Sequence, residues 1–353
     1  MLQDKQKDLL PMHNVKLTIL FIAKYCGLFV LARLMTNHGL RILCYHGFST
    51  SDEHLFRPKL FMTKAFFERR LNKITQMKFL VISLDQAVES LKCGRNLTNS
   101  LVITVDDGWH GVANVAAPLF SQHGFPWTLY LTTYYVQKQT QVTNVAIQYL
   151  CWKSTCAQIN INELNGSADE FFSLSNLDER AKLSNRLIAL QDKLGTADER
   201  QEFVRQLAIL LKVNQSDIEK RKLFHLLDEK SVDKLHQDGV DIQMHTHHHS
   251  LGDGADEIIS LEIIANQLGI EKACKHHAAH FCYPSGIYDR RYFSTLSGLG
   301  IVSATTCNPG LNYVKTNIME LNRFLDSENI SDIEFEAELS GFSELVRSFL
   351  KFW

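Results

Sequence analysis

Apolar residues along this chain alternate between short runs and longer stretches with helical spacing. The run Arg41 to Tyr45 (RILCY) lies between the turn residues Gly39 and Gly47 and predicts a buried strand. Residues 64–79 predict a helix behind the capping residue Thr63. The same reasoning predicts strands at 101–105, 128–131, 240–244, 280–283 and 301–305, and helices at 112–123, 260–270 and 290–296. Strands that alternate with helices predict an α/β fold with a parallel sheet or barrel.

Three segments depart from this alternation and suggest the domain organisation. Residues 140–238 are rich in Leu, Lys, Glu, Asp and Gln at helical spacing, and they predict a helical insertion. Residues 1–38 predict an N-terminal apolar or amphipathic helix, and residues 331–353 predict a C-terminal helix. The barrel itself is therefore expected to consist of residues 39–139 and 239–330.

The N-terminal segment Val15 to Met35 is strongly apolar but contains Lys16, Lys24 and Arg33. A spanning helix needs about 20 apolar residues with few charges, and a cleaved signal needs an uninterrupted apolar region before small residues. The segment fits neither pattern well. We therefore favour a helix that lies on a membrane surface, with peripheral membrane contact through residues 15–35. A helix packed within the protein and a true span are the alternatives.

The composition of the chain limits which classes of partner are expected and indicates a cellular compartment. The 353 residues are 45% hydrophobic, carry a formal net charge of −2 and contain no basic patch, so we expect no nucleic-acid partner. The eight cysteines are scattered without a CxxC pair, which is typical of buried thiols in a reducing compartment. We therefore expect a cytoplasmic protein, and leave open a disulfide between Cys151 and Cys156.

The first candidate for chemistry is the pair Asp106-Asp107, which ends a predicted strand in TVDDG. Two adjacent carboxylates repel each other and are costly to desolvate, unless a cation or a role as a base accounts for them. Asp-Gly is also a common turn dipeptide, so a plain turn is the alternative. Active sites of α/β barrels lie at such strand ends.

The second candidate is the histidine cluster in HTHHH, residues 245–249, which follows another predicted strand. Two histidines four residues apart, His245 and His249, can reach one metal ion. One aspartate with two histidines leaves open positions on the ion, as in a catalytic site. The second aspartate then remains free as a base. A solvated histidine-rich loop is the alternative.

TVDDG followed by HTHHH resembles the TFDDG and HTxxH motifs of the polysaccharide deacetylase family, the carbohydrate esterases with the NodB-homology fold. FCYPSG, residues 281–286, resembles the family's proline-glycine motif, so the resemblance covers about residues 41–323 apart from the insertion. It implies a distorted (β/α) barrel and a divalent metal, usually zinc. It also implies that Asp106 is the general base and that the metal ligands are Asp107, His245 and His249. His247 and His248 match variable positions of the motif.

Two departures from the family pattern concern the groups around the base. The proline-glycine motif lacks the usual arginine, and we expect Arg323 in LNRFL to supply that charge; a surface arginine is the alternative. The family's late acid histidine is also missing, since no histidine follows His280. Tyr45-His46-Gly47 resembles the permuted members, including those acting on poly-N-acetylglucosamine, which implies His46 as the acid. A structural role for His46 is the alternative.

The function expected from these residues is metal-dependent hydrolysis of N-acetyl groups on a carbohydrate. The substrate would be an N-acetylated saccharide: a polysaccharide, a glycan precursor or a lipid-linked saccharide. Trp109, Tyr135 and Tyr283 are candidates to flank the sugar. One alternative is a catalytically inactive glycan-binding protein on the same fold. Another is a metal phosphatase, although the chain has no Gly-rich phosphate loop near these motifs.

Overall fold

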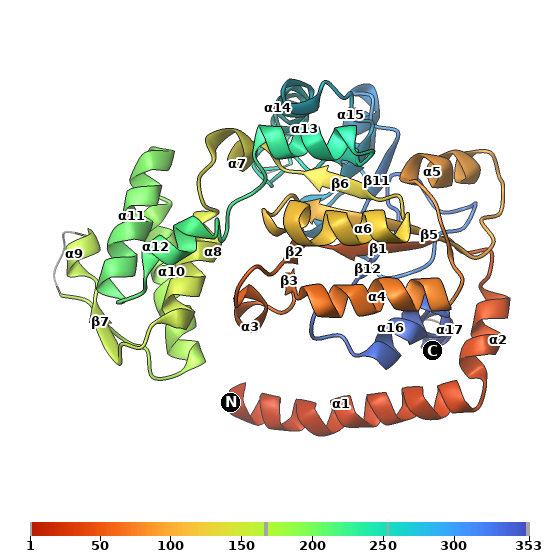
Figure 1. Cartoon of the computed structure of the whole chain (residues 1–353), viewed down its shortest axis with the longest axis horizontal. Helices are drawn as coiled ribbons and strands as arrows, with labels where there is room; N and C mark the ends of the chain where they lie inside the picture. Colours follow the sequence, from red (N-terminus) through yellow and green to blue (C-terminus); the bar gives the residue numbers. More distant parts are fainter. Residues whose placement is uncertain (1, 166–168, 253, 351–353) are drawn as a thin grey trace.

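A curled sheet of parallel strands forms the centre of the molecule (Figure 1). The structure is a computed structural model that describes residues 2–165, 169–252 and 254–350. The strand order is β11-β10-β9-β6-β5-β1-β12, with β4 paired to β5, and every pair in this sheet is parallel. The strands are β1 Arg41–Tyr45, β4 Leu80–Val81, β5 Ser100–Asp107, β6 Thr128–Leu131, β9 Asp241–Met244, β10 His280–Cys282, β11 Ser303–Thr305 and β12 Phe324–Leu325.

Residues 321–325 connect the two ends of the curled sheet. The short strand β12 pairs with β1, with Phe324 opposite Leu43. Just before it, Leu321 bridges to Thr305 of β11, and its backbone N–H donates to the Ala304 carbonyl at 2.9 Å. The first strand thus lies beside the last, and the expectation of a distorted (β/α) barrel is confirmed.

Helices surround the sheet and follow the apolar spacing of the sequence. Helix α4 (Lys64–Gln76) begins at Thr63, whose hydroxyl accepts from the Phe66 N–H at 3.3 Å. One helix was expected at 112–123, but the structure has a π-helical turn, η1 (Val112–Ala116), before α6 (Ala117–His123). Pro118 explains this difference because it has no N–H to donate to the preceding turn. The other helices around the sheet are α5 Leu84–Lys92, α7 Thr133–Lys138, α13 Glu229–Gln237, α14 Asp256–Cys274 and α15 Tyr292–Gly298, with a short 3₁₀ turn, η2, at Pro284–Gly286.

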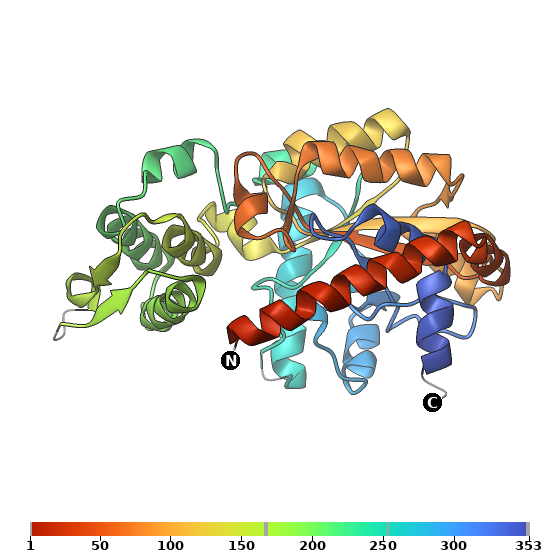
Figure 2. The ribbon, with the colours of Figure 1, turned by 90° about the horizontal axis from the view of Figure 1, so that it is seen from below.

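A lobe of helices lies to one side of the barrel (Figures 1 and 2). Its core is apolar and includes Leu183, Leu187 and Leu207, all fully buried. Helix α13 belongs to the range predicted as an insertion, yet it packs on α14 and β9, because Val232 and Leu235 face the barrel. The elements of the lobe are α8 Thr143–Lys153, β7 Gln158–Asn160, α9 Asn162–Asn165, β8 Phe171–Ser173, α10 Leu177–Gln191, α11 Ala197–Leu210 and α12 Gln215–Lys220.

Two helices precede the barrel, where one was expected. Helix α1 (Leu2–Tyr25) and helix α2 (Leu28–Met35) are bent by 77° around Gly27, whose φ of 78° ends the first helix. Helix α1 packs against α16 along the side of the barrel (Figure 2). In the part of the chain that the structure describes, no single helix is long and apolar enough to span a membrane. The bent pair together has that length and composition.

The C-terminal segment is also two helices and not the single one expected. Helix α16 (Asp332–Leu339) and helix α17 (Phe342–Leu350) are separated at Gly341, whose φ is 77°. A Cβ atom at Gly341 would lie 2.1 Å from the Thr36 hydroxyl oxygen, so the chain has no space for a side chain there. The remaining short elements, β2 (Gly47–Phe48), α3 (Glu53–Phe56) and β3 (Phe61–Met62), form an excursion between β1 and α4.

Candidate active site

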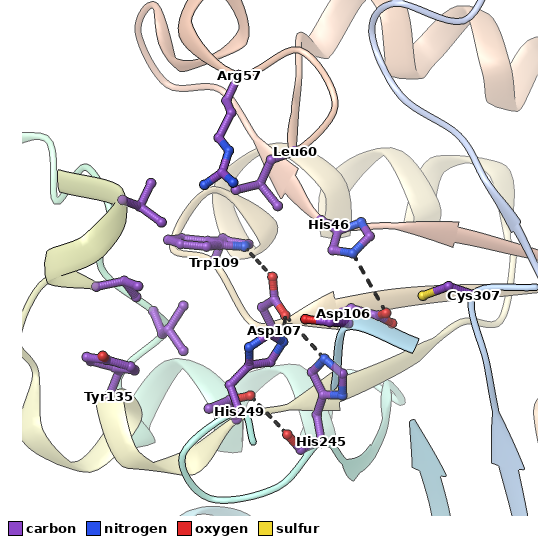
Figure 3. A pocket seen from close by; sticks show the side chains of 15 residues that line it. His46, Arg57, Leu60, Asp106, Asp107, Trp109, Tyr135, His245, His249 and Cys307 are labelled. Carbon is purple, nitrogen blue, oxygen red and sulfur yellow. Dashed lines mark hydrogen bonds and ion pairs between the residues drawn. The ribbon is translucent and has the colours of Figure 1, made fainter. Parts of the chain in front are cut away.

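The carboxyl ends of the central strands meet around one cavity of about 270 Å³ (Figure 3). In the register of the sheet, Tyr45 lies opposite Val105, so the residues that follow these two reach the same edge. All six site residues predicted from the sequence except Arg323 line the cavity, and Arg323 lies directly behind Asp106. The cavity is lined by His46, Arg57, Leu60, Asp106, Asp107, Trp109, Thr132, Tyr135, Val142, Val145, Leu226, His245, His249, Ser285 and Cys307.

Asp107 and two histidines form the centre of this cavity. The Oδ1 atom of Asp107 lies 3.3 Å from Nε2 of His245 and 3.4 Å from Nε2 of His249. Its other oxygen, Oδ2, accepts a hydrogen bond of 2.7 Å from the Trp109 indole N–H. Oδ1 is buried and has no hydrogen-bond partner within the described residues. One oxygen is therefore held by the protein, and the other faces two imidazole nitrogens.

The backbone around these residues is unusual. Asp107, Thr246 and His249 all have positive φ, at 72°, 63° and 59°. Non-glycine residues in this region carry a cost of order 1–3 kcal/mol, so the surrounding structure must enforce it. His245 is fixed through Nδ1, which lies 2.8 Å from the Cys282 carbonyl oxygen and directs Nε2 at Asp107. Such a backbone partner is typical of histidines that bind metals.

The donor set of Asp107, His245 and His249 fits a divalent cation. One ligand atom from each residue lies within 4.8 Å of the others. Burial alone would raise the pKa of Asp107, but the close contact with His245 and the charges of the nearby histidines lower it, so the carboxylate is ionised. Burial lowers the pKa of His249, which favours the neutral imidazole that ligates metals. A bound cation would give the Asp107 Oδ1 atom the partner that it lacks among the hydrogen-bond donors of the described residues.

Asp106 lies beside this centre and is paired with Arg323. The guanidinium donates from Nη1 to Oδ1 at 2.7 Å and from Nη2 to Oδ2 at 2.8 Å. Burial would raise the pKa of Asp106, but the charge and hydrogen bonds of Arg323 outweigh it and lower the pKa to about 2. Arg323 is itself fully buried and donates to the Thr306 carbonyl, so the alternative of a surface arginine is wrong.

His46 and two cysteines complete the surroundings of Asp106. Nε2 of His46 lies 3.9 Å from Asp106 Oδ2, and the ring lines the cavity (Figure 3). The thiols of Cys44 and Cys282 each lie 3.4 Å from the same oxygen. The sequence predicts both cysteines as buried core, which is correct for burial but misses this contact. The signal available in the sequence was that each cysteine lies two residues before a motif residue, Cys44 before His46 and Cys282 before Pro284.

The other histidines of the cluster and the three aromatic residues considered for sugar binding differ in where they lie relative to the cavity. His247 bonds to Thr133 at 2.9 Å, and His248 pairs with Glu262 at 2.7 Å, so neither contacts Asp107. Trp109 and Tyr135 line the cavity as expected. Tyr283 is fully buried and donates its hydroxyl to the Met319 carbonyl at 3.0 Å, so its predicted contact with a sugar is wrong.

The helical lobe and the excursion between β1 and α4 supply one side of the cavity. Val142 and Val145 come from the start of the lobe, and Leu226 from its end. Arg57 and Leu60 come from the excursion that contains α3. Sequence reasoning missed Arg57, because it lies outside every motif and only the fold brings it to the strand ends.

Comparisons with known proteins agree with this architecture. The sequence model of the family described as polysaccharide deacetylase matches residues 205–304, a segment that includes His245 and His249. The Streptococcus pyogenes deacetylase PplD, solved in complex with acetate, is 16% identical with a TM-score of 0.56, covering 85% of this chain and 98% of its own. IcaB from Ammonifex degensii is 13% identical with a TM-score of 0.53, covering 86% and 97%. A de-N-acetylase from Aggregatibacter actinomycetemcomitans is 12% identical with a TM-score of 0.52, covering 85% and 99%. No curated protein matches the sequence.

Proposed function

We propose that this chain, whose residues 205–304 match the polysaccharide deacetylase family, hydrolyses N-acetyl groups on a carbohydrate with a bound divalent cation, zinc. The observation that carries the proposal is the Asp107 Oδ1 atom, which accepts no hydrogen bond from the described residues and faces Nε2 of both His245 and His249. One solved neighbour is named as a deacetylase and another as a de-N-acetylase, which supports an N-acetyl group as the target.

The proposed reaction is hydrolysis of an acetamide. When bound by Asp107, His245 and His249, a divalent cation lowers the pKa of a water molecule and polarises the carbonyl group. Asp106, kept ionised by Arg323, accepts a proton as the water attacks the carbonyl carbon. His46 donates a proton to the nitrogen as the C–N bond breaks. Acetate and a free amine on the sugar are the products.

Elemental analysis of metal in purified protein tests the cation site. We expect about one zinc per wild-type chain after reconstitution, and loss of metal from Asp107→Ala and His245→Ala. His248→Ala is the matched control, because its ring pairs with Glu262 and lies outside the ligand set. A folded wild type that binds no metal, or metal retained in both ligand variants, contradicts the assignment.

Acetate release from N-acetylated saccharides tests the activity in parallel. We expect release by the zinc-loaded wild type and at least 100-fold slower release by Asp106→Asn, which keeps the metal ligands but removes the base. Wild-type protein that holds zinc and binds glycans without releasing acetate would instead indicate a glycan-binding protein on the same fold.

We further propose that helices α1 and α2 attach the protein to a membrane surface on its cytoplasmic side. All three cationic residues of 14–35 are turned towards the protein: Lys16 pairs with Glu334, Lys24 with Glu336, and Arg33 bonds to Asn99. The outward side is therefore apolar, and an exposed apolar patch of this kind is typical of an interaction surface. The exposed apolar residues are Val15, Ile19, Phe21, Ile22, Tyr25, Leu28, Val30, Leu31, Leu34 and Met35.

Sedimentation with lipid vesicles tests this attachment. We expect the wild type to pellet with the vesicles, and a double variant Ile22→Glu/Leu34→Glu to stay in the supernatant, because each change places a charge on the apolar side. Ile209→Glu is the matched control, since Ile209 is 77% exposed on α11 and Ile22 is 58% exposed. Wild-type protein that never pellets, or a double variant that pellets equally, contradicts the proposal.

A further inference from the structure

Arg57 is a cationic residue of the cavity that the proposed chemistry does not use. Its side chain lines the cavity beside Leu60 and Trp109 (Figure 3). Within the described residues its guanidinium group has no hydrogen bond and no ion pair. The buried arginines behave differently: Arg41 donates to the Leu339 carbonyl, Arg70 pairs with Asp326, and Arg323 with Asp106.

The backbone holds Arg57 firmly in place although its side chain has no partner. Its N–H donates to the Glu53 carbonyl at 2.8 Å, and its own carbonyl accepts from Leu60 and Phe61, both at 2.9 Å. The preceding turn is fixed in addition by the buried Glu53 carboxylate, which accepts from the Ser51 N–H at 2.7 Å. The guanidinium is therefore presented to the cavity from a defined turn.

An unpartnered guanidinium in a half-buried position carries a desolvation cost that a ligand can offset. Partial burial lowers the pKa of Arg57, and the charge of Asp107 across the cavity opposes that shift. The acidic residues that line the cavity are Asp106 and Asp107, and neither forms an ion pair with Arg57. The fork of N–H donors therefore remains available to a group that enters from solvent.

We propose that Arg57 determines specificity by binding an anionic group, a carboxylate or a phosphate, that the N-acetylated saccharide carries. A planar guanidinium matches both groups with two parallel hydrogen bonds. The acetamide would lie at Asp107 and the charged group on the side of the cavity formed by Leu60 and Trp109. This inference rests on the proposed function, because it takes the saccharide to be the ligand of the cavity.

Calorimetric binding of three probes to the zinc-loaded protein tests the inference. The probes are N-acetylglucosamine, N-acetylglucosamine 1-phosphate and N-acetylmuramic acid, which are neutral, phosphorylated and carboxylated. We expect the wild type to bind at least one charged probe about tenfold or more tightly than the neutral one, as a charge-assisted bidentate contact would give. Which charged probe is preferred then identifies the group.

Variants at Arg57 assign the preference to this side chain. Arg57→Met should reduce the ratio of charged to neutral binding to near one, and Arg57→Lys should retain part of it, because it keeps the charge without the fork. Arg69→Met is the matched control, since Arg69 is exposed on α4 and lies over the Phe66 ring outside the cavity. It should preserve the wild-type ratio.

Equal binding of all three probes by the wild type, or a preference that survives in Arg57→Met, would overturn the inference. Acetate release from uncharged N-acetylglucosamine oligomers is measured separately on the same wild-type preparation. Failure of that reaction counts against the proposed function, whereas equal binding counts against the role of Arg57 alone.

Discussion

At the scale of single residues, Asp106 owes its ionised state to one arginine. The carboxylate is fully enclosed, its two oxygens accept from both terminal nitrogens of Arg323, and the two residues are 217 positions apart in sequence. Removing one member of a buried ion pair leaves an uncompensated charge, and this is strongly destabilising. The pair therefore serves stability as well as the proposed base.

Arg323→Met should lower the free energy of unfolding by about 3–5 kcal/mol at pH 7. In the wild type the pKa of Asp106 is depressed to about 2, so its stabilising contribution is present above the unfolded pKa of about 3.9 and is lost as pH falls towards 2. In the variant, burial without Arg323 raises that pKa, so stability increases as pH falls and the carboxyl is protonated. Urea unfolding at pH 7 and pH 5 should show the difference between the proteins shrinking at the lower pH.

The double variant Asp106→Asn/Arg323→Met is the control for this prediction. Neither buried charge remains, so it should recover much of the stability that Arg323→Met loses. A double variant that is less stable than the single one by the full cost of Asp106→Asn alone would mean that the two residues act independently.

Single residues also show how far the sequence predicts the site. Asp107, His245 and His249 are predictable, because they lie at or shortly after the end of a strand in short motifs of known spacing. Arg323 is predictable only indirectly. The proline-glycine motif lacks its usual arginine, so the sequence indicates that another arginine must supply the charge. Arg57 is not predictable, because its approach to the cavity depends on the path of the excursion around α3.

At the scale of elements, the central strands were predictable and the breaks between terminal helices were not. Short apolar runs in the sequence predict the strands, as in Arg41 to Tyr45, whose side chains are all buried. At Gly341 the chain passes so close to Thr36 that it has no space for a side chain, and Thr36 is far away in sequence. A local pattern of apolar residues contains no information about that contact, so one C-terminal helix was the natural prediction.

The two glycine breaks allow a matched test of this contact. Gly27 and Gly341 have nearly the same φ, 78° and 77°, but a Cβ atom at Gly27 meets nothing within 4 Å. Gly27→Ala should cost about 1 kcal/mol of stability from backbone strain alone. Gly341→Ala should cost clearly more, because Thr36 must move as well.

Thermal unfolding of both variants measures these costs. Combining Gly341→Ala with Thr36→Ala, which removes the colliding hydroxyl, should bring its cost closer to that of Gly27→Ala. Equal costs for the two single variants would show that the contact with Thr36 relaxes freely.

At the scale of the whole molecule, the lobe and the barrel meet at Asp52. Its carboxylate accepts from the Tyr149 hydroxyl at 2.8 Å and pairs with Lys153, both on α8 of the lobe. Asp52 also precedes α3, and Arg57 caps the C-terminus of that helix. This contact therefore fixes the turn that carries Arg57 against the lobe that supplies Val145 to the cavity.

Asp52→Ala should weaken this contact between α8 and the turn before α3 without altering the metal ligands. We expect the KM for an N-acetylated saccharide to rise about three- to tenfold while zinc content stays at the wild-type level, because misplaced binding groups weaken substrate positioning. Lys182→Ala, which removes an exposed ion pair with Glu179 within the lobe, is the control and should leave KM unchanged. Loss of zinc from Asp52→Ala would contradict a role for Asp52 that is confined to the contact with α8.

The pairing of β1 with β12 has a consequence for how the protein is made. During translation, Asp106 leaves the ribosome long before Arg323, so the nascent barrel contains the carboxylate without its counter-charge and lacks the strand that joins β1 to β11. The residues proposed for metal binding are complete by position 249, yet the barrel cannot close around them until about position 325. We expect ribosome-bound chains stalled near residue 310 to remain protease-sensitive and inactive, so that activity appears only after residue 325 has emerged from the ribosome.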